Sequence, residues 1–555
     1  MIEMTLDVVC KNIESALEKQ EYGEAEKWLW PALDQFYDHP QLLFYSSHIY
    51  VRQERYVSAY LASLRSYELA PNGYAAANLG AICRRLNKLD EAVKWLTVAT
   101  EYDSDNKHAW NNFAAAFVNE GDPWRGIEAG TRALSLDPNF QKARWNRGLL
   151  KLEAGDFETG WDDYRAGLAS GERMMRSYGK TETSPPFLLD SRSALIHFRE
   201  THGRKPRLVI WGEQGIGDEI MFSTIIPDLS EDAEIIFECH PRLINLHKAS
   251  FSKYVAEFYP TRKESGVIEW AKHTAPIDFK APMGDLGRFY RRDRQSFKTA
   301  CETYGPLFKP ETELAATFDE GLTELAKMAG RENPVRIGFA YTGGIVKTMR
   351  WYRTVDPMLL APILMHPDVM PISLQYEDEG PSLDAFKQRF GQPYYSFPSV
   401  TQAHDYMNTC ALVNSLDCVI TVCTSVAHLA AAMGKTTYVL VPQRCAWRYG
   451  SNDQENWYWY DFDNVHLLRA KDETGWAPVL EKLKGYLTRD WGIDFESDAA
   501  RVAERSGAGP LEGAIRFSSG DATGGTVRAF PIPRAIGGVG TGDTAPVREN
   551  AGVGE

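Results

Sequence analysis

An acidic residue at the predicted start of a helix, Asp218, is the first candidate for chemistry in this sequence. It follows an apolar strand expected over Arg207–Trp211 and precedes a helix expected over 219–229. Between them, glycines let the backbone turn tightly and approach a ligand closely. The loop lacks the third glycine of a dinucleotide fingerprint and the Gly-Lys-Ser/Thr of a P-loop. We therefore expect a carboxylate at the mouth of an α/β domain, positioned by Gln214, Gly215 and Gly217.

A second candidate site follows the strand expected over Cys418–Val422. Thr424 is a good N-cap residue, which leaves the backbone N–H groups of Ser425 and Val426 free of intrahelical partners. Free N–H groups and the helix dipole favour an anion, and His428 lies one turn further on the same face. These residues predict a diphosphate site. The alternative is that Thr424 only caps the helix and His428 only packs.

A basic cluster follows another predicted strand, over 335–341, and a Thr-Gly-Gly segment. Lys347, Arg350 and Arg353 make up this cluster. Arginine suits phosphate oxygens because its planar fork donates two hydrogen bonds, and lysine adds a mobile charge. The cluster favours a local anion pocket, and a solvated loop is the alternative.

Signals for metal binding are weak. The eight cysteines form no C-x-x-C pair and do not cluster with histidine, so neither a zinc site nor a disulfide framework is expected. Asp461 and Asp463 have the spacing of a divalent-metal motif, but the spacing is short and common, and we interpret this segment as a surface or interdomain loop. We expect no metal and no cofactor.

The elements that must position these residues begin after a helical repeat array. Small residues recur at steps of 33 or 34 residues, a period typical of helix-turn-helix solenoids. This array resembles the tetratricopeptide repeat (TPR) family, notably in 77–80 (Ala-Asn-Leu-Gly) and 89–92 (Leu-Asp-Glu-Ala). Three columns of small residues follow the period, and they are Ala25, Ala59, Ala92, Gly126 and Gly160; Ser47, Gly80, Ala114 and Gly148; and Ala32, Ser66, Ala99, Ala133 and Gly167.

Strands alternate with helices after the repeats, which predicts parallel sheets covered by helices. Strands are also expected over 233–238, 370–374 and Thr436–Val441. The predicted divisions are a repeat domain over 1–180, a linker over 181–206, two Rossmann-like domains over 207–332 and 333–496, and a disordered, Gly-rich tail over 497–555.

Composition limits the function classes. A formal net charge of −14 argues against broad binding to nucleic acid or to anionic membranes, although a local basic pocket remains compatible with it. We find no leader-like N-terminus and no long uninterrupted apolar run. A cytoplasmic protein without a transmembrane segment is expected, and its oligomeric state is left open.

Together these segments resemble heptosyltransferase-like glycosyltransferases, specifically bacterial proteins that join tetratricopeptide repeats to such a domain. Besides the two candidate sites, the resemblance rests on residues 155–164, Ser373-Leu374-Gln375, Asp405, residues 417–420, the helix expected over 424–434, and Trp447-Arg448. It implies the two-domain GT-B fold. It also implies metal-independent, inverting transfer of a sugar from a nucleotide-diphospho-sugar.

The resemblance also implies roles for individual residues. Asp218 is the expected general base. The family holds the acceptor mainly on the first α/β domain and the donor on the second, where Gln375 would lie near the nucleotide. Lys347, Arg350 and Arg353 match the family's basic segment only loosely. The family has an acidic residue immediately before Thr424, whereas this chain has Cys423, so one donor contact is in doubt.

Three functions follow from these observations. The first is a glycosyltransferase acting on a hydroxyl of a glycan or protein, with the repeats recruiting the acceptor or a partner. The second is an interaction protein whose repeats bind a peptide and whose glycosyltransferase-like part is inactive. The third, weaker alternative is a phosphohydrolase that uses the same anion pocket.

Overall fold

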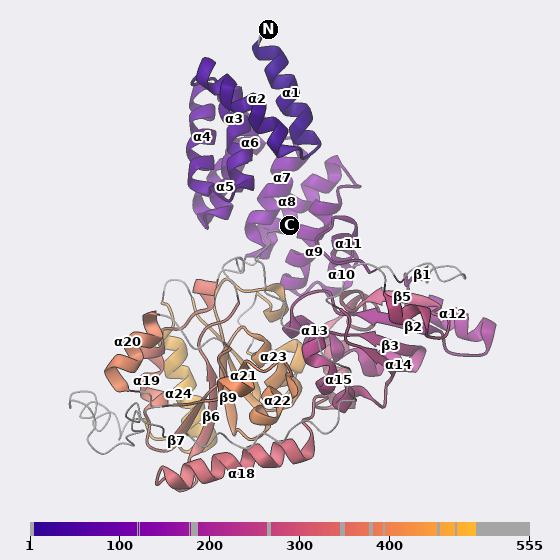
Figure 1. Ribbon diagram of the computed structural model, residues 1–555, viewed down its shortest axis with the longest axis vertical. Coiled ribbons are helices and arrows are strands. Elements are labelled where there is room, and N and C mark those ends of the chain that lie inside the picture. Colours follow the sequence, from indigo (N-terminus) through magenta and orange to yellow (C-terminus); the bar gives the residue numbers. More distant parts are fainter. Residues whose placement is uncertain are drawn as a thin grey trace, which may run out of the picture.

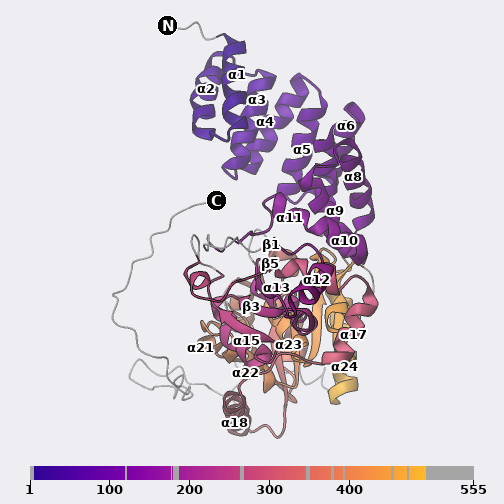
Figure 2. The same cartoon turned by 90° about the vertical axis from the view of Figure 1, so that its right-hand side faces the viewer.

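A helical solenoid stands above two α/β units that lie side by side (Figures 1 and 2). The computed structural model describes residues 5–118, 120, 122–176, 178, 187–262, 268–344, 350–376, 381–391, 394–451, 455–471 and 474–495. The predicted tail over 497–555 and the candidate residue Lys347 lie outside the described residues. None of the described helices is long and apolar enough to cross a membrane.

The solenoid is tetratricopeptide-like and is built from antiparallel helix pairs. Small residues lie where the helices approach one another, since Ala25, Ala59, Ala92, Gly126 and Gly160 are each the fourth residue of the second helix in a pair. A side chain added at Gly126 would clash with Leu150 and Phe117, so the small residue sets the helix spacing. The pairs are α1 (Leu6–Glu18) with α2 (Tyr22–Gln35), α3 (Pro40–Arg52) with α4 (Tyr56–Leu69), α5 (Gly73–Arg85) with α6 (Leu89–Tyr102), α7 (Lys107–Phe117) with α8 (Pro123–Leu136), and α9 (Gln141–Ala154) with α10 (Phe157–Tyr164), followed by the short α11 (Ala166–Ala169).

The first α/β unit contains a parallel sheet in the order β1-β5-β2-β3-β4. The predicted linker over 181–206 contributes β1 and α12 to this unit. Its strands are β1 (Phe187–Leu188), β2 (Arg207–Trp211), β3 (Glu234–Glu238), β4 (Val255–Tyr259) and β5 (Phe279–Pro282). Its helices are α12 (Arg192–His202), α13 (Ile216–Ser223), α14 (Ile226–Asp232), η1 (Pro241–Leu243), α15 (Ile244–Phe251), η2 (Glu269–Lys272), η3 (Met283–Asp285), α16 (Gly287–Tyr290) and α17 (Arg294–Tyr304).

The second α/β unit contains a parallel sheet in the order β11-β10-β9-β6-β7-β8. Helix α18 (Thr312–Met328) runs beneath the second unit and leads into it (Figure 1). Its strands are β6 (Val335–Ala340), β7 (Val369–Ser373), β8 (Tyr395–Ser396), β9 (Cys418–Val422), β10 (Thr436–Val441) and β11 (Val465–Arg469). Its helices are η5 (Arg350–Arg353), α19 (Pro357–Leu364), α20 (Pro381–Phe390), α21 (Pro398–Thr401), α22 (Met407–Asn414), α23 (Ser425–Ala432), η6 (Trp447–Tyr449), η7 (Tyr458–Tyr460) and α24 (Ala477–Trp491).

The predicted strands agree with the observed ones to within one residue, but the helix expected over 219–229 is wrong in its extent. It is divided into α13, which ends at Ser223, and α14, which begins at Ile226. Pro227 lies in the first turn of α14. Proline has no backbone N–H and suits a helix's first turn rather than its interior, so the division follows from the sequence.

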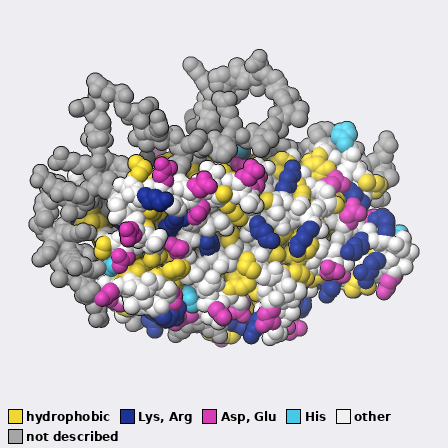
Figure 3. Space-filling view, turned by 90° about the horizontal axis from the view of Figure 1, so that it is seen from below, with side chains coloured by type: hydrophobic (Ala, Val, Ile, Leu, Met, Phe, Trp, Pro, Cys, Tyr) yellow, Lys and Arg dark blue, Asp and Glu magenta, His cyan; other side chains and the backbone are white. Residues whose placement is uncertain are grey.

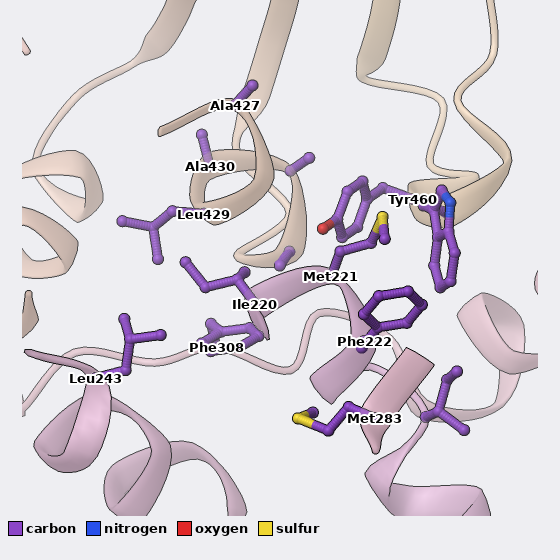
Figure 4. Close-up of a cluster of buried hydrophobic side chains, with 14 of the residues drawn as sticks. Ile220, Met221, Phe222, Leu243, Met283, Phe308, Ala427, Leu429, Ala430 and Tyr460 are labelled. Atoms are coloured by element: carbon purple, nitrogen blue, oxygen red, sulfur yellow. The ribbon is translucent and has the colours of Figure 1, made fainter. Parts of the chain in front are cut away.

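The two α/β units share a hydrophobic core where α13 crosses α23. Ile220, Met221 and Phe222 of α13 are fully or almost fully buried; Ile220 lies below the alanine-rich α23, whereas Phe222 lies on the side of Tyr460 (Figure 4). Alanine and glycine let the two helices pack closely, so the contact between the units is an extended apolar surface rather than a few polar bridges.

The last repeat is anchored to both units by aromatic side chains. The ring of Trp161 lies 5.5 Å from that of Trp447 and 6.4 Å from that of Phe222, with each distance taken between ring centroids. The indole N–H of Trp161 donates to the carbonyl of Arg291 at 2.7 Å. The solenoid end, the first unit and the second unit therefore meet in one buried cluster.

Charged side chains are distributed over the lower surface of the α/β part. Where that face is visible, acidic and basic groups are interspersed among apolar ones (Figure 3). The net negative charge of the chain is thus not gathered into one patch on the visible part of this face.

Candidate functional site

Each parallel sheet has a point where the strand order reverses. In the first sheet it lies between β2 and β5, and in the second between β6 and β9. Open α/β sheets bind ligands at such points, in the crevice beyond the carboxyl ends of the strands. The topology therefore defines two candidate crevices.

The crevice of the first sheet is filled by the chain itself. Arg173, from the segment after the last repeat, is fully buried and pairs with Glu213 after β2 and Asp285 after β5. Its guanidinium donates to the Asp285 carboxylate at 2.7 Å and lies 4.4 Å above the ring of Tyr164. Two carboxylates at the switch point thus share one buried guanidinium as an internal partner.

The same segment continues across the carboxyl end of β3. Arg176 donates to the buried Glu238 carboxylate through Nε at 3.1 Å, and the Tyr178 hydroxyl donates to it at 2.7 Å. The indole N–H of Trp211 donates to the carbonyl of Met174 at 3.1 Å. The crevice that the resemblance assigns to the acceptor is therefore occupied by residues of this chain.

The crevice of the second sheet is an open pocket of about 500 Å³. It contains five of the predicted donor-site residues, and Arg353 and His428 are not among its lining residues. The lining residues are Ile216, Arg242, Ala340, Thr342, Gly343, Gly344, Arg350, Leu374, Gln375, Tyr376, Thr401, Tyr406, Thr409, Thr424, Ser425 and Val426. The structure thus brings together the segment after β6 and the start of α23.

Thr424 occupies the N-cap position of α23 but its side chain does not cap the helix. Its hydroxyl is 3.0 Å from that of Thr421 instead. Ser425 receives a hydrogen bond from the Tyr406 hydroxyl at 3.0 Å. The expectation of a side-chain cap is therefore wrong, although the first turn of α23 faces the pocket as predicted, through Ser425 and Val426.

The basic and amide side chains around this pocket support its walls. Arg350 donates through Nε to the Thr342 hydroxyl at 3.3 Å, which places it at the rim after β6. Gln375 accepts from the backbone N–H groups of Tyr341 and Thr342 at 2.9 and 3.2 Å. Arg353 points to the carbonyl of Cys423 at 3.5 Å. Gln375 therefore fixes the loop after β6, and Arg350 lines the open space together with Arg242.

Asp218 lies at the junction of the two units. One carboxylate oxygen, Oδ2, accepts from the backbone N–H of Gly215 at 3.1 Å, and Oδ1 pairs with Arg448 of the second unit at 2.5 Å. Burial lowers the pKa of Arg448, but Asp218 raises it, and the net shift is upward. The ion pair therefore joins the units next to the start of α23.

The glycines of this loop have a different function from the one expected. Neither Gly215 nor Gly217 adopts a positive φ, so no tight turn requires them. Gly217 lies inside α13, and a β-carbon there would come within 3.2 Å of the Ser425 Cα and the His428 ring. Gln214 donates to the Tyr164 hydroxyl at 2.8 Å. The loop is thus shaped by helix contact and by the docked repeat.

His428 packs behind the pocket. Its ring nitrogens lie 3.0 Å from the Tyr460 hydroxyl and 3.4 Å from the Tyr449 hydroxyl, and 3% of the residue is exposed. Burial, with a smaller effect of Arg448, holds its pKa well below the usual value, so the ring is neutral. This arrangement matches the alternative given for His428, a packed residue, and does not place it against a diphosphate.

Cys423 is buried below the same helix start. Burial raises the pKa of its thiol to about 11, and nearby arginines oppose that shift. A protonated, enclosed thiol is a poor nucleophile. Cys423 is therefore an enclosed residue that does not line the pocket, and it leaves no carboxylate immediately before Thr424.

Sequence reasoning missed three arginines. Arg173 and Arg242 carry no local motif, because their partners are distant in sequence and only the fold brings them together. Arg448 belongs to the Trp447-Arg448 pair that supports the resemblance, so this pair was the one sequence feature that could have indicated Arg448 as a site residue. No spacing rule links it to Asp218.

Comparisons with known proteins give a coarse outcome. No protein-family model matches the chain. It is 24% identical over 447 residues to protein FlbA of Caulobacter vibrioides, an alignment covering 74% of this chain and 71% of that protein. Among solved structures, one similar to part of the chain is YrrB, a TPR protein with an unusual peptide-binding site. The two are 17% identical, the match covers 30% of this chain and 87% of that chain, and the TM-score is 0.25. MamA from Desulfovibrio magneticus RS-1 is 18% identical, over 30% of this chain and 94% of that chain, with a TM-score of 0.26.

These names state no activity for the two α/β units. The helix pairing described above, rather than the partial likenesses, is what characterises the N-terminal part as a tetratricopeptide-like solenoid. The chain is therefore a solenoid joined to two parallel α/β units whose second switch point is open.

Proposed function

We propose that this chain is a metal-independent, inverting glycosyltransferase with the two-domain GT-B arrangement. It would transfer a sugar from a nucleotide-diphospho-sugar to a hydroxyl of a glycan or protein acceptor. The solenoid would recruit the acceptor or a partner protein, in keeping with its helical-repeat fold.

One observation carries this proposal. The first turn of α23, which lines the open pocket, lies against the loop that carries Asp218, and Gly217 is the point of contact with Ser425. A diphosphate held at the helix start would therefore place its sugar near a carboxylate of the other unit. A transfer site formed between two units needs this proximity.

The transfer step uses few groups. The acceptor oxygen attacks the anomeric carbon, the bond from that carbon to the diphosphate oxygen breaks, and the acceptor proton passes to Asp218. An ionised carboxylate offers about four lone-pair sites, so its contacts with Gly215 and Arg448 leave room for an acceptor hydroxyl. Arg350 and the N–H groups of α23 would stabilise the charge that grows on the leaving diphosphate.

The test is donor turnover by Asp218→Asn. Nucleotide release would be measured with a panel of nucleotide sugars, and we expect a loss of roughly 100-fold or more with donor binding retained. Asp319→Asn, on the exposed side of α18, is a matched control that should keep full turnover. If the wild-type protein neither binds nor turns over any nucleotide sugar, the proposal fails.

A second candidate function is an interaction protein with an inactive transferase-like module. Two observations favour it: both oxygens of Asp218 are engaged, and Cys423 stands where the resembled family has an acid. The same panel separates the candidates. A protein that binds a partner through its solenoid, and shows no difference between wild type and Asp218→Asn with any donor, would have this second function.

A further inference from the structure

The last helix pair, α9 with α10, packs aromatic rings against both α/β units. Phe157 is 1% exposed, and its ring centroid lies 4.9 Å from that of Phe297 on α17 and 5.0 Å from that of Tyr458 in η7. Trp161, one turn further along α10, is equally buried, and its ring lies 5.5 Å from that of Trp447 in η6. Since α17 belongs to the first unit and η6 and η7 belong to the second, the rings of α10 lie where the two units meet.

Hydrogen bonds from the same helix pair also reach both units. The Tyr164 hydroxyl at the end of α10 accepts from the amide of Gln214 in the first unit at 2.8 Å. The carbonyl of Glu153 in α9 accepts from the backbone N–H of Ser451 in the second unit at 3.1 Å. We call residues 141–164, which form α9 and α10, the brace. The brace is thus tied to each unit by polar as well as apolar contacts.

The two units also touch each other directly beside the brace. The backbone N–H of Tyr406 donates to the Arg242 carbonyl at 2.9 Å, and the Asn245 amide donates to the Asp405 carboxylate at 2.6 Å. One continuous apolar core includes buried side chains of α10, α13 and α23. Domains that share a small polar interface move relative to one another by default, whereas a large hydrophobic interface holds them together. Opening these units would expose buried rings to water, which the hydrophobic effect opposes.

The open pocket needs no separation of the units to receive a ligand. Its volume of about 500 Å³ lies within the range of small-molecule pockets, roughly 300–1,000 Å³. Ile216 and Arg242 of the first unit line it together with the start of α23. The ion pair of Asp218 with Arg448, at 2.5 Å, crosses the same junction. The pocket and the carboxylate beside it are therefore formed with the units in their present positions.

We propose that the brace, centred on Trp161, holds the two α/β units as one preassembled body whose pocket takes a ligand without hinge closure. Trp161 is a positioning residue, because it acts through the packing of the units and does not line the pocket. The inference goes beyond the proposed function, since it concerns the relation between the units whatever chemistry the pocket supports. It also assigns the last repeat to the α/β part of the chain rather than to partner recruitment.

The distance between the units tests this inference. Cysteines for spin labels would be introduced at two exposed positions of the full-length chain, Arg199→Cys on α12 and Glu481→Cys on α24. Double electron–electron resonance should give one narrow distance distribution for the doubly labelled chain. Addition of uridine, guanosine, adenosine or cytidine diphosphate should leave that distribution unchanged. The chain without these two substitutions measures any labelling of its native cysteines, of which seven are buried and one is partly buried.

Matched variants connect this distance to the brace. Trp161→Ala removes the central ring, and it should broaden the distribution and add longer distances. Trp161→Phe retains an aromatic ring and should recover most of the wild-type distribution. Trp124→Ala is the control and should match the wild type, because Trp124 lies on α8 of the preceding repeat and is 65% exposed. Circular dichroism checks that each variant is folded, and Phe157→Leu, a smaller loss of ring packing, replaces Trp161→Ala if that variant does not fold.

The outcomes separate this inference from the proposed function. A wild-type distribution that is broad or has two distances would overturn the preassembled body, and so would a shift of that distribution with any of the diphosphates. A folded Trp161→Ala or Phe157→Leu variant with the wild-type distribution would overturn the role of the brace. None of these results bears on sugar transfer. A wild type that shows the expected distances and their dependence on Trp161, but turns over no nucleotide sugar, would support the brace and count against the proposed function.

Discussion

The two sheets of this protein reverse their strand order in the same way, yet one crevice is filled and the other is open. In the first, Arg173 pairs with Glu213 and Asp285 at the switch point. In the second, Arg242 and Arg350 border a pocket of about 500 Å³. Topology locates a crevice, but the side chains around it decide whether the chain or a ligand fills it.

The two crevices also differ in their charged residues. The first is acidic, and the chain supplies the guanidinium groups that pair with its carboxylates. The described lining residues of the second include Arg242 and Arg350 and no aspartate or glutamate. A buried charge needs a partner. The filled crevice shows how an internal partner satisfies that need.

Removing the internal partner of the filled crevice should have the largest effect on stability. Arg173→Met leaves two buried carboxylates uncompensated, and we expect a loss of about 3–5 kcal/mol in the free energy of unfolding. Burial raises the pKa of Glu213 while Arg173 opposes that shift. Urea unfolding followed by tryptophan fluorescence measures the change.

Arg199→Met on α12 is the control for this change, because Arg199 is exposed and should alter stability by no more than about 0.5 kcal/mol. A similar small effect for both variants would show that the first crevice does not depend on its arginine. The contrast between a filled and an open crevice would then lose its energetic basis.

The strands could be predicted from the sequence, but the contrast between the filled and the open crevice could not. Apolar runs such as Cys418–Val422 define a buried strand by local composition alone, and the 34-residue period defines the helix pairs. The pocket residues after β6 and β9 were also predictable, since both follow strand ends. Arg173 and Arg242 were not, because their partners lie in other units and no periodicity connects them.

His428 behind the open crevice predicts a pH dependence of stability. Its folded-state pKa is lowered well below the usual value of about 6.5, so below pH 6.5 the unfolded chain takes up a proton that the folded chain does not. Stability contributed by the neutral ring is complete above that pH and decreases as pH falls, by at most about 1.4 kcal/mol per pH unit.

The free energy of unfolding would be measured between pH 7.5 and 5.5 for the wild type and His428→Gln. The two proteins are then compared by the slope of this free energy against pH. We expect a shallower slope in the variant, whatever its absolute stability. His202→Gln, on the exposed end of α12, should keep the wild-type slope. Parallel curves for all three proteins would contradict the burial argument.

A smaller effect is expected where the open crevice meets the first unit. Gly217→Ala would place a β-carbon 3.2 Å from the Ser425 Cα, and overpacking outweighs the gain in helix propensity, for a net loss of about 1 kcal/mol. Gly485→Ala in α24 meets no atom within 4 Å and should gain about 0.5–1 kcal/mol. Thermal unfolding of the two variants should therefore shift in opposite directions. If the unfolding temperatures of both variants rose, the crossing of α13 and α23 would tolerate a methyl group.

The smallest expected effect concerns Cys423, which is buried immediately before Thr424 of the open crevice. Burial raises its thiol pKa to about 11, so at neutral pH fewer than about one in a thousand molecules carries the thiolate. Cys423→Ala should keep sugar transfer within about threefold, and native wild-type protein should resist maleimide labelling at this site by peptide mapping. A steep loss of transfer together with rapid native labelling would make Cys423 a participant in the reaction. That result would move the chemistry from Asp218 at the junction of the units to Cys423 at the end of β9.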